Sequence, residues 1–202
     1  MTYTLKREEL GNGLLASVLE ALAKAYKEIG AEVYVVGAAA RDLSLKLLGA
    51  GSAPRRTMDL DVAVLLEKWD EYERLTEILI KDGFVKAPEK QRFYYCGIEN
   101  VRYEVDIVPF GDIAQEEMVA WPPEGNPVMS VRCFADVMKN ADKVSVEDRF
   151  DFRMASLSGQ WLIKLDAWCD RRLMTRKDAA DMQFILENAY ITLALSVSYT
   201  HL

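Results

Sequence analysis

Two aspartates two residues apart are the most informative chemical feature of this 202-residue sequence. Asp59 and Asp61 begin the run Asp-Leu-Asp-Val-Ala-Val, whose apolar residues predict a β-strand. Successive side chains on a strand point to opposite faces, so both carboxylates are expected on one face. Such like charges repel unless a cation lies between them, and magnesium prefers hard oxygen ligands. The pair therefore predicts half of a metal site, with a turn or a solvated strand edge as the ordinary alternative.

A third carboxylate lies on another predicted strand, in residues 100–109. Asp106 precedes the apolar pair Ile-Val and is expected beside Asp59 and Asp61 if the two strands are neighbours. Glu104 shares its face and is the competing ligand, but Asp106 lies deeper in the apolar run. Three carboxylates favour a site for two metal ions, which would stabilise the entering and leaving oxygens of a phosphoryl displacement.

A strand-to-helix junction lies upstream of the two aspartates. The strand-like residues 32–36 lead into Gly37 and an alanine-rich segment with high helix propensity. At such a junction the free N–H groups and the helix dipole can receive a phosphate, and a glycine lets it approach the main chain. The ordinary alternative is a simple strand-helix turn.

These segments together resemble the nucleotidyltransferase superfamily, whose pattern is a strand, a Gly-Gly or Gly-Ser turn into a helix, Asp-x-Asp, and a third Asp on an adjacent strand. Residues 36–42, Val-Gly-Ala-Ala-Ala-Arg-Asp, also resemble the equivalent segment of CCA-adding enzymes and poly(A) polymerases. Ala38 departs from the pattern because it has no hydroxyl. Any phosphate contact there must come from backbone N–H groups.

A later segment resembles the AbiEii-type nucleotidyltransferases, known mainly as bacterial toxins. Residues 155–171 contain a lysine-bearing helix, and residues 176–181 read Arg-Lys-Asp-Ala-Ala-Asp. The resemblance implies three catalytic metal ligands, Asp59, Asp61 and Asp106. It implies nucleotide-binding roles for Gly37, Ala38, Arg41, Arg56, Thr57, Lys164, Arg171, Lys177, Asp178 and Asp181.

Helical spacing supports some of these roles independently. Lys164, Trp168, Arg171 and Arg172 share one face of a helix, which suits a triphosphate or a solvated stripe. Thr175 followed three residues later by an acid is also typical of a capping box, which alone would explain Asp178. Asp181 is spaced to pair with Lys177, an ordinary surface ion pair.

The predicted architecture is α/β (α+β), a nucleotidyltransferase-type mixed sheet flanked by helices and followed by C-terminal helices. The periodicity predicts helices over 6–29, 38–48 and 68–82, strands over 59–66, 128–137 and 152–155, and a hairpin of 93–96 with 101–108 around Glu99 and Asn100. We expect a catalytic core over 1–156, a helical segment over 157–190 that completes the nucleotide site, and a non-native or disordered tail over 191–202.

Composition narrows the function classes. The net charge of −7 argues against a broad nucleic-acid-binding surface, although a small basic patch is compatible with it. The three cysteines are scattered, which indicates neither a disulfide framework nor a zinc site. The only histidine, His201, is at the tail, which argues against histidine-based catalysis. No segment predicts a membrane span or a secretory signal, so we expect a cytoplasmic protein without membrane contact.

The sequence thus predicts a nucleotidyltransferase that uses Mg²⁺ or Mn²⁺ to transfer a nucleoside monophosphate from an NTP to an acceptor hydroxyl. The resemblance favours an RNA or tRNA end as acceptor and a toxin role with a cognate antitoxin. Two alternatives remain open: an aminoglycoside or lincosamide adenylyltransferase, and a nucleotide-binding module without catalysis.

Overall fold

The computed structural model describes residues 1–11, 13–49, 59–96 and 102–199, with side chains described as far as residue 190. Its described helices are the 3₁₀-helix η1 (Arg7–Leu10) and the α-helices α1 (Gly13–Glu28), α2 (Gly37–Leu47), α3 (Trp69–Lys81), α4 (Phe134–Lys139), α5 (Leu157–Arg171) and α6 (Lys177–Tyr199). Its described strands are β1 (Thr2–Leu5), β2 (Tyr34–Val36), β3 (Asp59–Leu65), β4 (Phe84–Lys86), β5 (Arg92–Cys96), β6 (Arg102–Phe110), β7 (Met118–Ala120), β8 (Val128–Ser130), β9 (Asp142–Val146) and β10 (Phe150–Met154).

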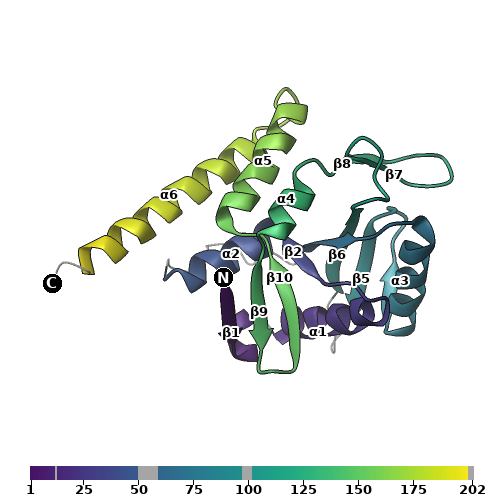
Figure 1. Cartoon of the computed structure of the whole chain (residues 1–202), viewed down its shortest axis with the longest axis horizontal. Helices are drawn as coiled ribbons and strands as arrows, with labels where there is room; N and C mark the ends of the chain where they lie inside the picture. The colour runs from purple at the N-terminus through teal and green to yellow at the C-terminus, as the bar shows by residue number, and fades with distance from the viewer. Residues whose placement is uncertain (12, 50–58, 97–101, 200–202) are drawn as a thin grey trace.

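Eight of these strands form one mixed sheet in the order β1-β9-β10-β2-β3-β6-β5-β4 (Figure 1). Strand β3 lies at its centre, antiparallel to β2 and parallel to β6. Strands β7 and β8 pair separately as a small hairpin. The predicted fold class, a mixed sheet flanked by helices and followed by C-terminal helices, is therefore confirmed.

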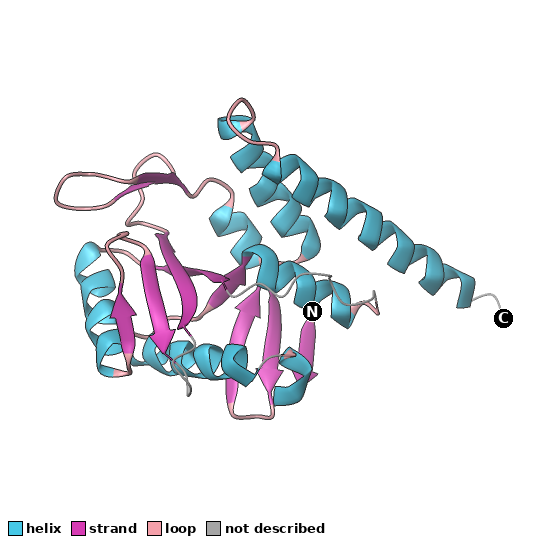
Figure 2. Cartoon of the chain, turned by 180° about the vertical axis from the view of Figure 1, so that it is seen from behind, coloured by secondary structure: helices cyan, strands magenta, loops and turns pink. Residues whose placement is uncertain are grey.

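The alternation of side chains along β3 and β6 gives the sheet a core on each face. Leu60, Val62 and Ile107 are fully buried on one face in a cluster that includes residues of α1 and α3. Ala63 and Phe110 are buried on the other, against β7, β8 and α4. Figure 2 shows the sheet from behind with helices at both faces. Asp59 and Asp61 alternate with Leu60 and therefore belong to the second face.

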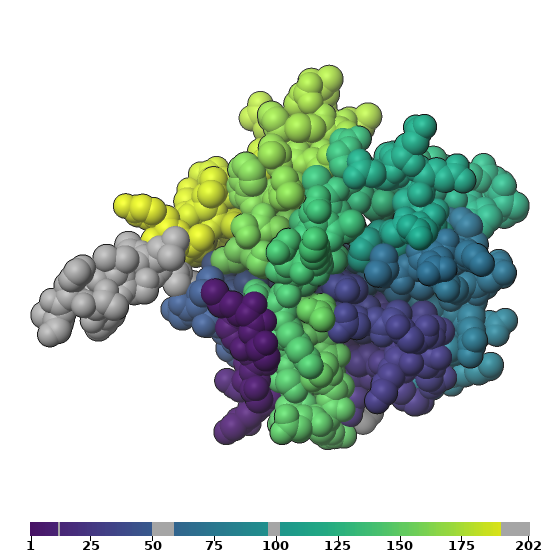
Figure 3. All heavy atoms as spheres, in the orientation of Figure 1, coloured from purple at the N-terminus to yellow at the C-terminus, as the bar shows by residue number. Residues whose placement is uncertain are grey.

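The C-terminal helices pack on each other and on α2. Ser156 caps α5, because its hydroxyl accepts a hydrogen bond from the Gly159 N–H at 3.2 Å. Figure 3 shows α5 in light green and the described side chains of α6 in yellow at the periphery of the molecule. None of the helices within the described ranges is both long and apolar enough to cross a bilayer.

Two sequence predictions of secondary structure are wrong. The helix expected over 6–29 is divided, because the 3₁₀-helix η1 ends at Gly11, which adopts a left-handed φ of 75°, and α1 begins only at Gly13. The strand expected over 128–137 ends at Ser130, and α4 follows after Cys133 adopts a φ of 69°. In both cases a change of backbone conformation interrupts a continuous apolar pattern.

Candidate active site

The candidate site lies on a row of directly paired residues that crosses four neighbouring strands. Val36 on β2 pairs with Asp61 on β3, Asp61 pairs with Asp106 on β6, and Asp106 pairs with Arg92 on β5. Directly paired residues of neighbouring strands point to the same face, about 5 Å apart. Asp61 and Asp106 are therefore adjacent, as the sequence predicted.

A second row lies two residues earlier along β3. Asp59 pairs with Glu104 on β6, so four carboxylates share one face of the two parallel strands. Asp59 is exposed, whereas Asp61 and Asp106 are partly buried. The predicted placement of Asp59 and Asp61 on one face therefore holds.

Gly37 is the first residue of α2 and lies against the Asp61 carboxylate. It has a left-handed φ of 65°, and a Cβ added to it would stand 2.1 Å from Oδ2 of Asp61. The N-cap residue is Val36, and no described side chain caps the helix there. Helix N-terminal N–H groups without a side-chain cap can bind an anion. Ala38 is the next residue, and its methyl side chain leaves only the backbone to serve this role.

The surroundings of Asp61 disfavour the negative charge of its carboxylate. Burial first, and then the negative charges of Asp106 and Asp59, raise its pKa from 3.8 to about 6. The positive charges of Lys164 and Lys177 act in the opposite direction. A divalent cation on the Asp59 and Asp61 carboxylates would relieve this repulsion, so the residues fit such an ion.

Asp106 has a partner that the sequence analysis missed. Arg92 donates from Nε to Asp106 Oδ1 at 2.8 Å and from Nη2 to Oδ2 at 2.9 Å. Nη2 also lies 2.7 Å from Glu104 Oε1. Hydrogen bonding to Asp106 raises the pKa of the Arg92 guanidinium above its usual range. The predicted third metal ligand is therefore held by an arginine fork.

Four of the predicted nucleotide-binding residues form an ion-pair network between helices. Asp178, fully buried, accepts from Arg171 Nε at 2.6 Å and from Nη2 at 2.7 Å. Lys164 Nζ lies 2.7 Å from Asp181 Oδ2 and 3.5 Å from Asp178 Oδ1. The Arg171 guanidinium lowers the pKa of the Asp178 carboxyl. The network thus joins α5 to the first turns of α6.

Arg41 extends this network to α2. Its guanidinium contacts Asp181 Oδ1 at 3.2 Å and Asp42 Oδ1 at 2.8 Å. It also lies over the Phe184 ring, 4.9 Å from the centroid. Two minor sequence predictions are therefore wrong: Asp181 pairs with Lys164 and Arg41 rather than Lys177, and the Asp178 carboxylate bonds Arg171 instead of closing a capping box. These partners come from other helices, which local spacing cannot show.

The remaining predicted site residues fall into two groups. Lys177 is exposed, and its ammonium has no ion-pair partner within the described part of the chain, although its charge acts on Asp61. Arg56 and Thr57 lie outside the described residues. No group of three or more Asp, Glu, Cys or His side chains in the described ranges is arranged to enclose a metal ion. The three-ligand metal site remains a prediction.

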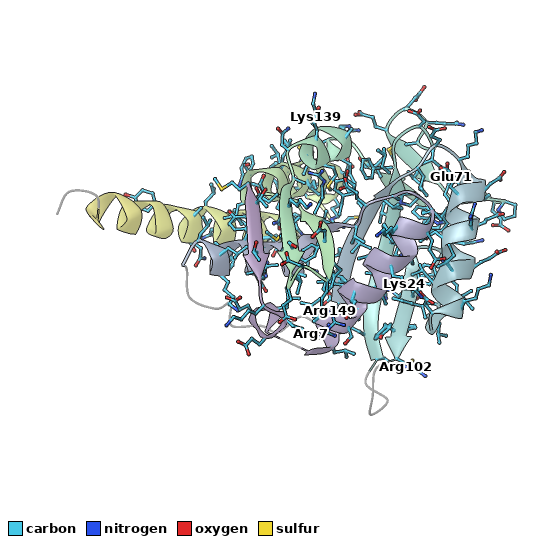
Figure 4. The ribbon with its side chains drawn as sticks, turned by 60° about the horizontal axis from the view of Figure 1, so that its bottom comes forward. Arg7, Lys24, Glu71, Arg102, Lys139 and Arg149 are labelled. Atoms are coloured by element: carbon cyan, nitrogen blue, oxygen red, sulfur yellow. The ribbon has the colours of Figure 1, made fainter. Side chains whose placement is uncertain are left out.

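A separate hollow of about 860 Å³ lies between α1 and the β9–β10 hairpin. Figure 4, which brings the bottom of Figure 1 forward, shows Lys24 and Arg149 on this side of the molecule. Both have carboxylate partners: Lys24 lies 3.1 Å from Asp82, and Arg149 lies 3.0 Å from Glu20, which also pairs with Arg7. This surface therefore offers no cluster of unpaired charge comparable to the carboxylate row.

The chain matches no family model. It also matches no curated protein. Among solved structures it is similar to the lincosamide antibiotic adenylyltransferase LnuA, with 16% identity, a TM-score of 0.45, and coverage of 90% of this chain and 96% of the other. For the antibiotic-resistance factor ANT(2'')-Ia the identity is 14%, the TM-score 0.45, and the coverage 94% of each chain.

A third similar structure is the Thermotoga maritima CCA-adding enzyme in complex with tRNA. The identity is 22%, the TM-score 0.34, and the match covers 50% of this chain. The chain spans only 23% of that enzyme. All three TM-scores lie below 0.5.

The close approach of Gly37 to Asp61 gives a testable prediction for Gly37→Ala. A matched control is Gly30→Ala, because Gly30 has a similar φ of 75° but open space where a Cβ would stand. We expect the control to lose about 1 kcal/mol of unfolding free energy from backbone strain alone. Gly37→Ala should lose about 1–3 kcal/mol more through the collision. Urea unfolding measures both, and equal losses would contradict the close contact.

Proposed function

We propose that this protein is a nucleotidyltransferase of the superfamily that the sequence resembles, transferring a nucleoside monophosphate from an NTP to an acceptor hydroxyl. The observation that carries the proposal is the Asp61 carboxylate beside the N-terminus of α2. Gly37 lets the two approach, and no described side chain caps the helix. A site for a metal-bound triphosphate needs this combination of carboxylates and free N–H groups.

Each group has a defined part in the proposed reaction. The Gly37 and Ala38 N–H groups bind triphosphate oxygens, and the Lys177 ammonium neutralises their charge. The acceptor oxygen forms a bond to the α-phosphorus. The bond between the α-phosphorus and the oxygen that bridges to the β-phosphate breaks, and pyrophosphate leaves. Asp106 accepts the hydroxyl proton, since a carboxylate in an arginine fork retains further lone pairs. No covalent enzyme intermediate is required.

Mg²⁺ or Mn²⁺ is part of the proposal, held by Asp59 and Asp61. Bound there, the ion would neutralise phosphate charge and lower the pKa of the acceptor hydroxyl. The chain itself contributes the placement, since Asp61 is fixed between Gly37 on one side and Asp106 on the other. The raised pKa of Asp61 supports this, because burial and the charges of Asp106 and Asp59 disfavour its negative charge and a bound cation would stabilise it.

We propose RNA, for instance a tRNA end, as the acceptor. The turn between α5 and α6 carries the exposed cations Arg172, Arg176 and Lys177 beside the exposed Leu173 and Met174. Of these cations, Lys177 is near enough for its charge to act on Asp61, and exposed cations suit the phosphates of an RNA strand. A lincosamide or aminoglycoside has no phosphate to meet them, so the antibiotic alternative has less support from this surface.

Transfer of label tests the reaction and its acceptor. Purified protein with Mg²⁺ or Mn²⁺, each α-labelled NTP and total cellular RNA should label an RNA band. Asp61→Asn should abolish labelling while preserving the circular dichroism spectrum. Asp70→Asn, which removes an exposed carboxylate from α3, is the matched control and should retain it. Full labelling by Asp61→Asn would refute the proposal, and label on a small antibiotic instead of RNA would transfer support to the alternative.

Substitutions of the two lysines near Asp61 should have different effects, one on NTP binding and the other on the free energy of unfolding. Lys177→Met should weaken NTP binding about tenfold and leave the unfolding free energy within about 0.5 kcal/mol, because the side chain is exposed. Lys164→Met should lose about 1–3 kcal/mol of stability, because Asp181 and Asp178 lose a charged partner. Nucleotide titration and urea unfolding measure the two effects. The opposite pattern would assign the phosphate contact to Lys164.

The toxin role is the most specific part of the proposed function. It rests only on the resemblance to the AbiEii-type nucleotidyltransferases. Induced expression in a bacterial host should arrest growth if the chain modifies an essential RNA. Asp59→Ala should relieve the arrest, and immunoblotting should show equal protein levels. Growth arrest by the Asp59→Ala variant, or none by the native chain, would contradict a toxin role and its cognate antitoxin.

A further inference from the structure

Arg92 provides the only guanidinium contact to the carboxylate face within the described residues. It reaches across from β5 to hold both oxygens of Asp106 and one of Glu104. Its side chain is 26% exposed, and those of Asp106 and Glu104 are 21% and 32% exposed. A forked arginine pair with this degree of shelter fixes geometry as well as charge.

The fork constrains which ions Asp106 can meet. Asp106 stands between Asp61 and Arg92 in the row across the sheet. Both of its oxygens already accept from Arg92, at 2.8 Å and 2.9 Å, on the side away from Asp61. A metal ion that used Asp106 as a full ligand would have to compete with a fixed positive charge adjacent to it. Asp59 and Asp61 meet no such competition from an ion pair among the described residues.

The charges at the site favour the same conclusion. Four carboxylates, Asp59, Asp61, Glu104 and Asp106, share the face, which is enough negative charge for two divalent ions. Arg92 gives the two carboxylates of β6 one positive charge, whereas no ion pair among the described residues reaches the two carboxylates of β3. The larger share of unpaired negative charge therefore lies on β3.

We propose that Arg92 takes the place of a second metal ion, so that the site binds one divalent cation on Asp59 and Asp61 and leaves Asp106 outside the metal's coordination. The proposal rests on the proposed function and revises the ligand set predicted from the sequence. Arg92 is a positioning residue: it holds the Asp106 carboxylate in place beside the acceptor without contacting the reacting phosphate. The lone pairs of Asp106 that Arg92 does not use remain available to accept a proton.

The number of bound Mn²⁺ ions tests this directly. Titration of the full chain with Mn²⁺, with free ion quantified by electron paramagnetic resonance, should give one ion per chain. Asp106→Asn should leave that number and its dissociation constant unchanged within twofold. Asp61→Asn should abolish binding. Two ions in the native chain, one of them lost in Asp106→Asn, would overturn the proposal for Arg92 while supporting a metal-dependent enzyme.

Variants of Arg92 provide the second measurement. Arg92→Met removes the fixed charge and should admit a second Mn²⁺ that is lost again in the Arg92→Met, Asp106→Asn double variant. Arg92→Lys keeps the charge and should bind one. Arg102→Met is the matched control, because Arg102 shares the same face of β6 but lies over Tyr94, 5.9 Å from the ring centroid. A single ion in folded Arg92→Met would overturn the proposal, and no Mn²⁺ in the native chain would overturn the proposed function too.

Discussion

The close approach of Gly37 to the Asp61 carboxylate is the constraint on which the site depends. A side chain at residue 37 would occupy the volume of Oδ2, so only glycine allows α2 to begin directly beside β3. This contact brings the N–H groups of a helix to a carboxylate that is already repelled by its neighbours. Two features that are unfavourable alone, an uncapped helix start and crowded acids, together form the site that we propose for a metal-bound phosphate.

The C-terminal helices α5 and α6 are joined by ion pairs to α2, the helix that begins at this contact. Asp178 and Asp181 at the start of α6 bind cations from α5 and α2, so three helices are joined through two carboxylates. A buried carboxylate such as Asp178 is costly unless it is paired, and the Arg171 fork supplies that pairing. The network therefore holds Lys164 in place near Asp61. Lys177 has no ion-pair partner within the described part of the chain, and we propose that its ammonium meets the substrate.

Much of the site could be predicted because strand alternation is a local property. The two-residue spacing was sufficient to place Asp59 and Asp61 on one face, and the apolar run around Asp106 was sufficient to place it on a strand. The pairing of that strand with β3 came from the structure. The helix after Gly37 also follows directly from alanine propensity. What local patterns could not provide were the partners of Asp178 and Asp181, which come from other helices.

The sequence analysis missed Arg92 for a related reason. The register between β5 and β6 decides which residue lies opposite Asp106. A hairpin centred between Glu99 and Asn100 would place Phe93 opposite Asp106, whereas the structure places Arg92 there. A shift of one residue moves every side chain of a strand to the other face. The alternation of Arg92 and Tyr94 with the buried Phe93 was the available signal, since the polar residues of β5 had to share the face of the acids.

The most direct test of the central claim is a crystal structure with Mg²⁺ and a non-hydrolysable NTP. We expect the triphosphate at the N-terminus of α2, with its oxygens on the Gly37 and Ala38 N–H groups and the metal ion on Asp59 and Asp61. A nucleotide bound away from this row, for example in the hollow between α1 and the β9–β10 hairpin, would contradict the proposed active site.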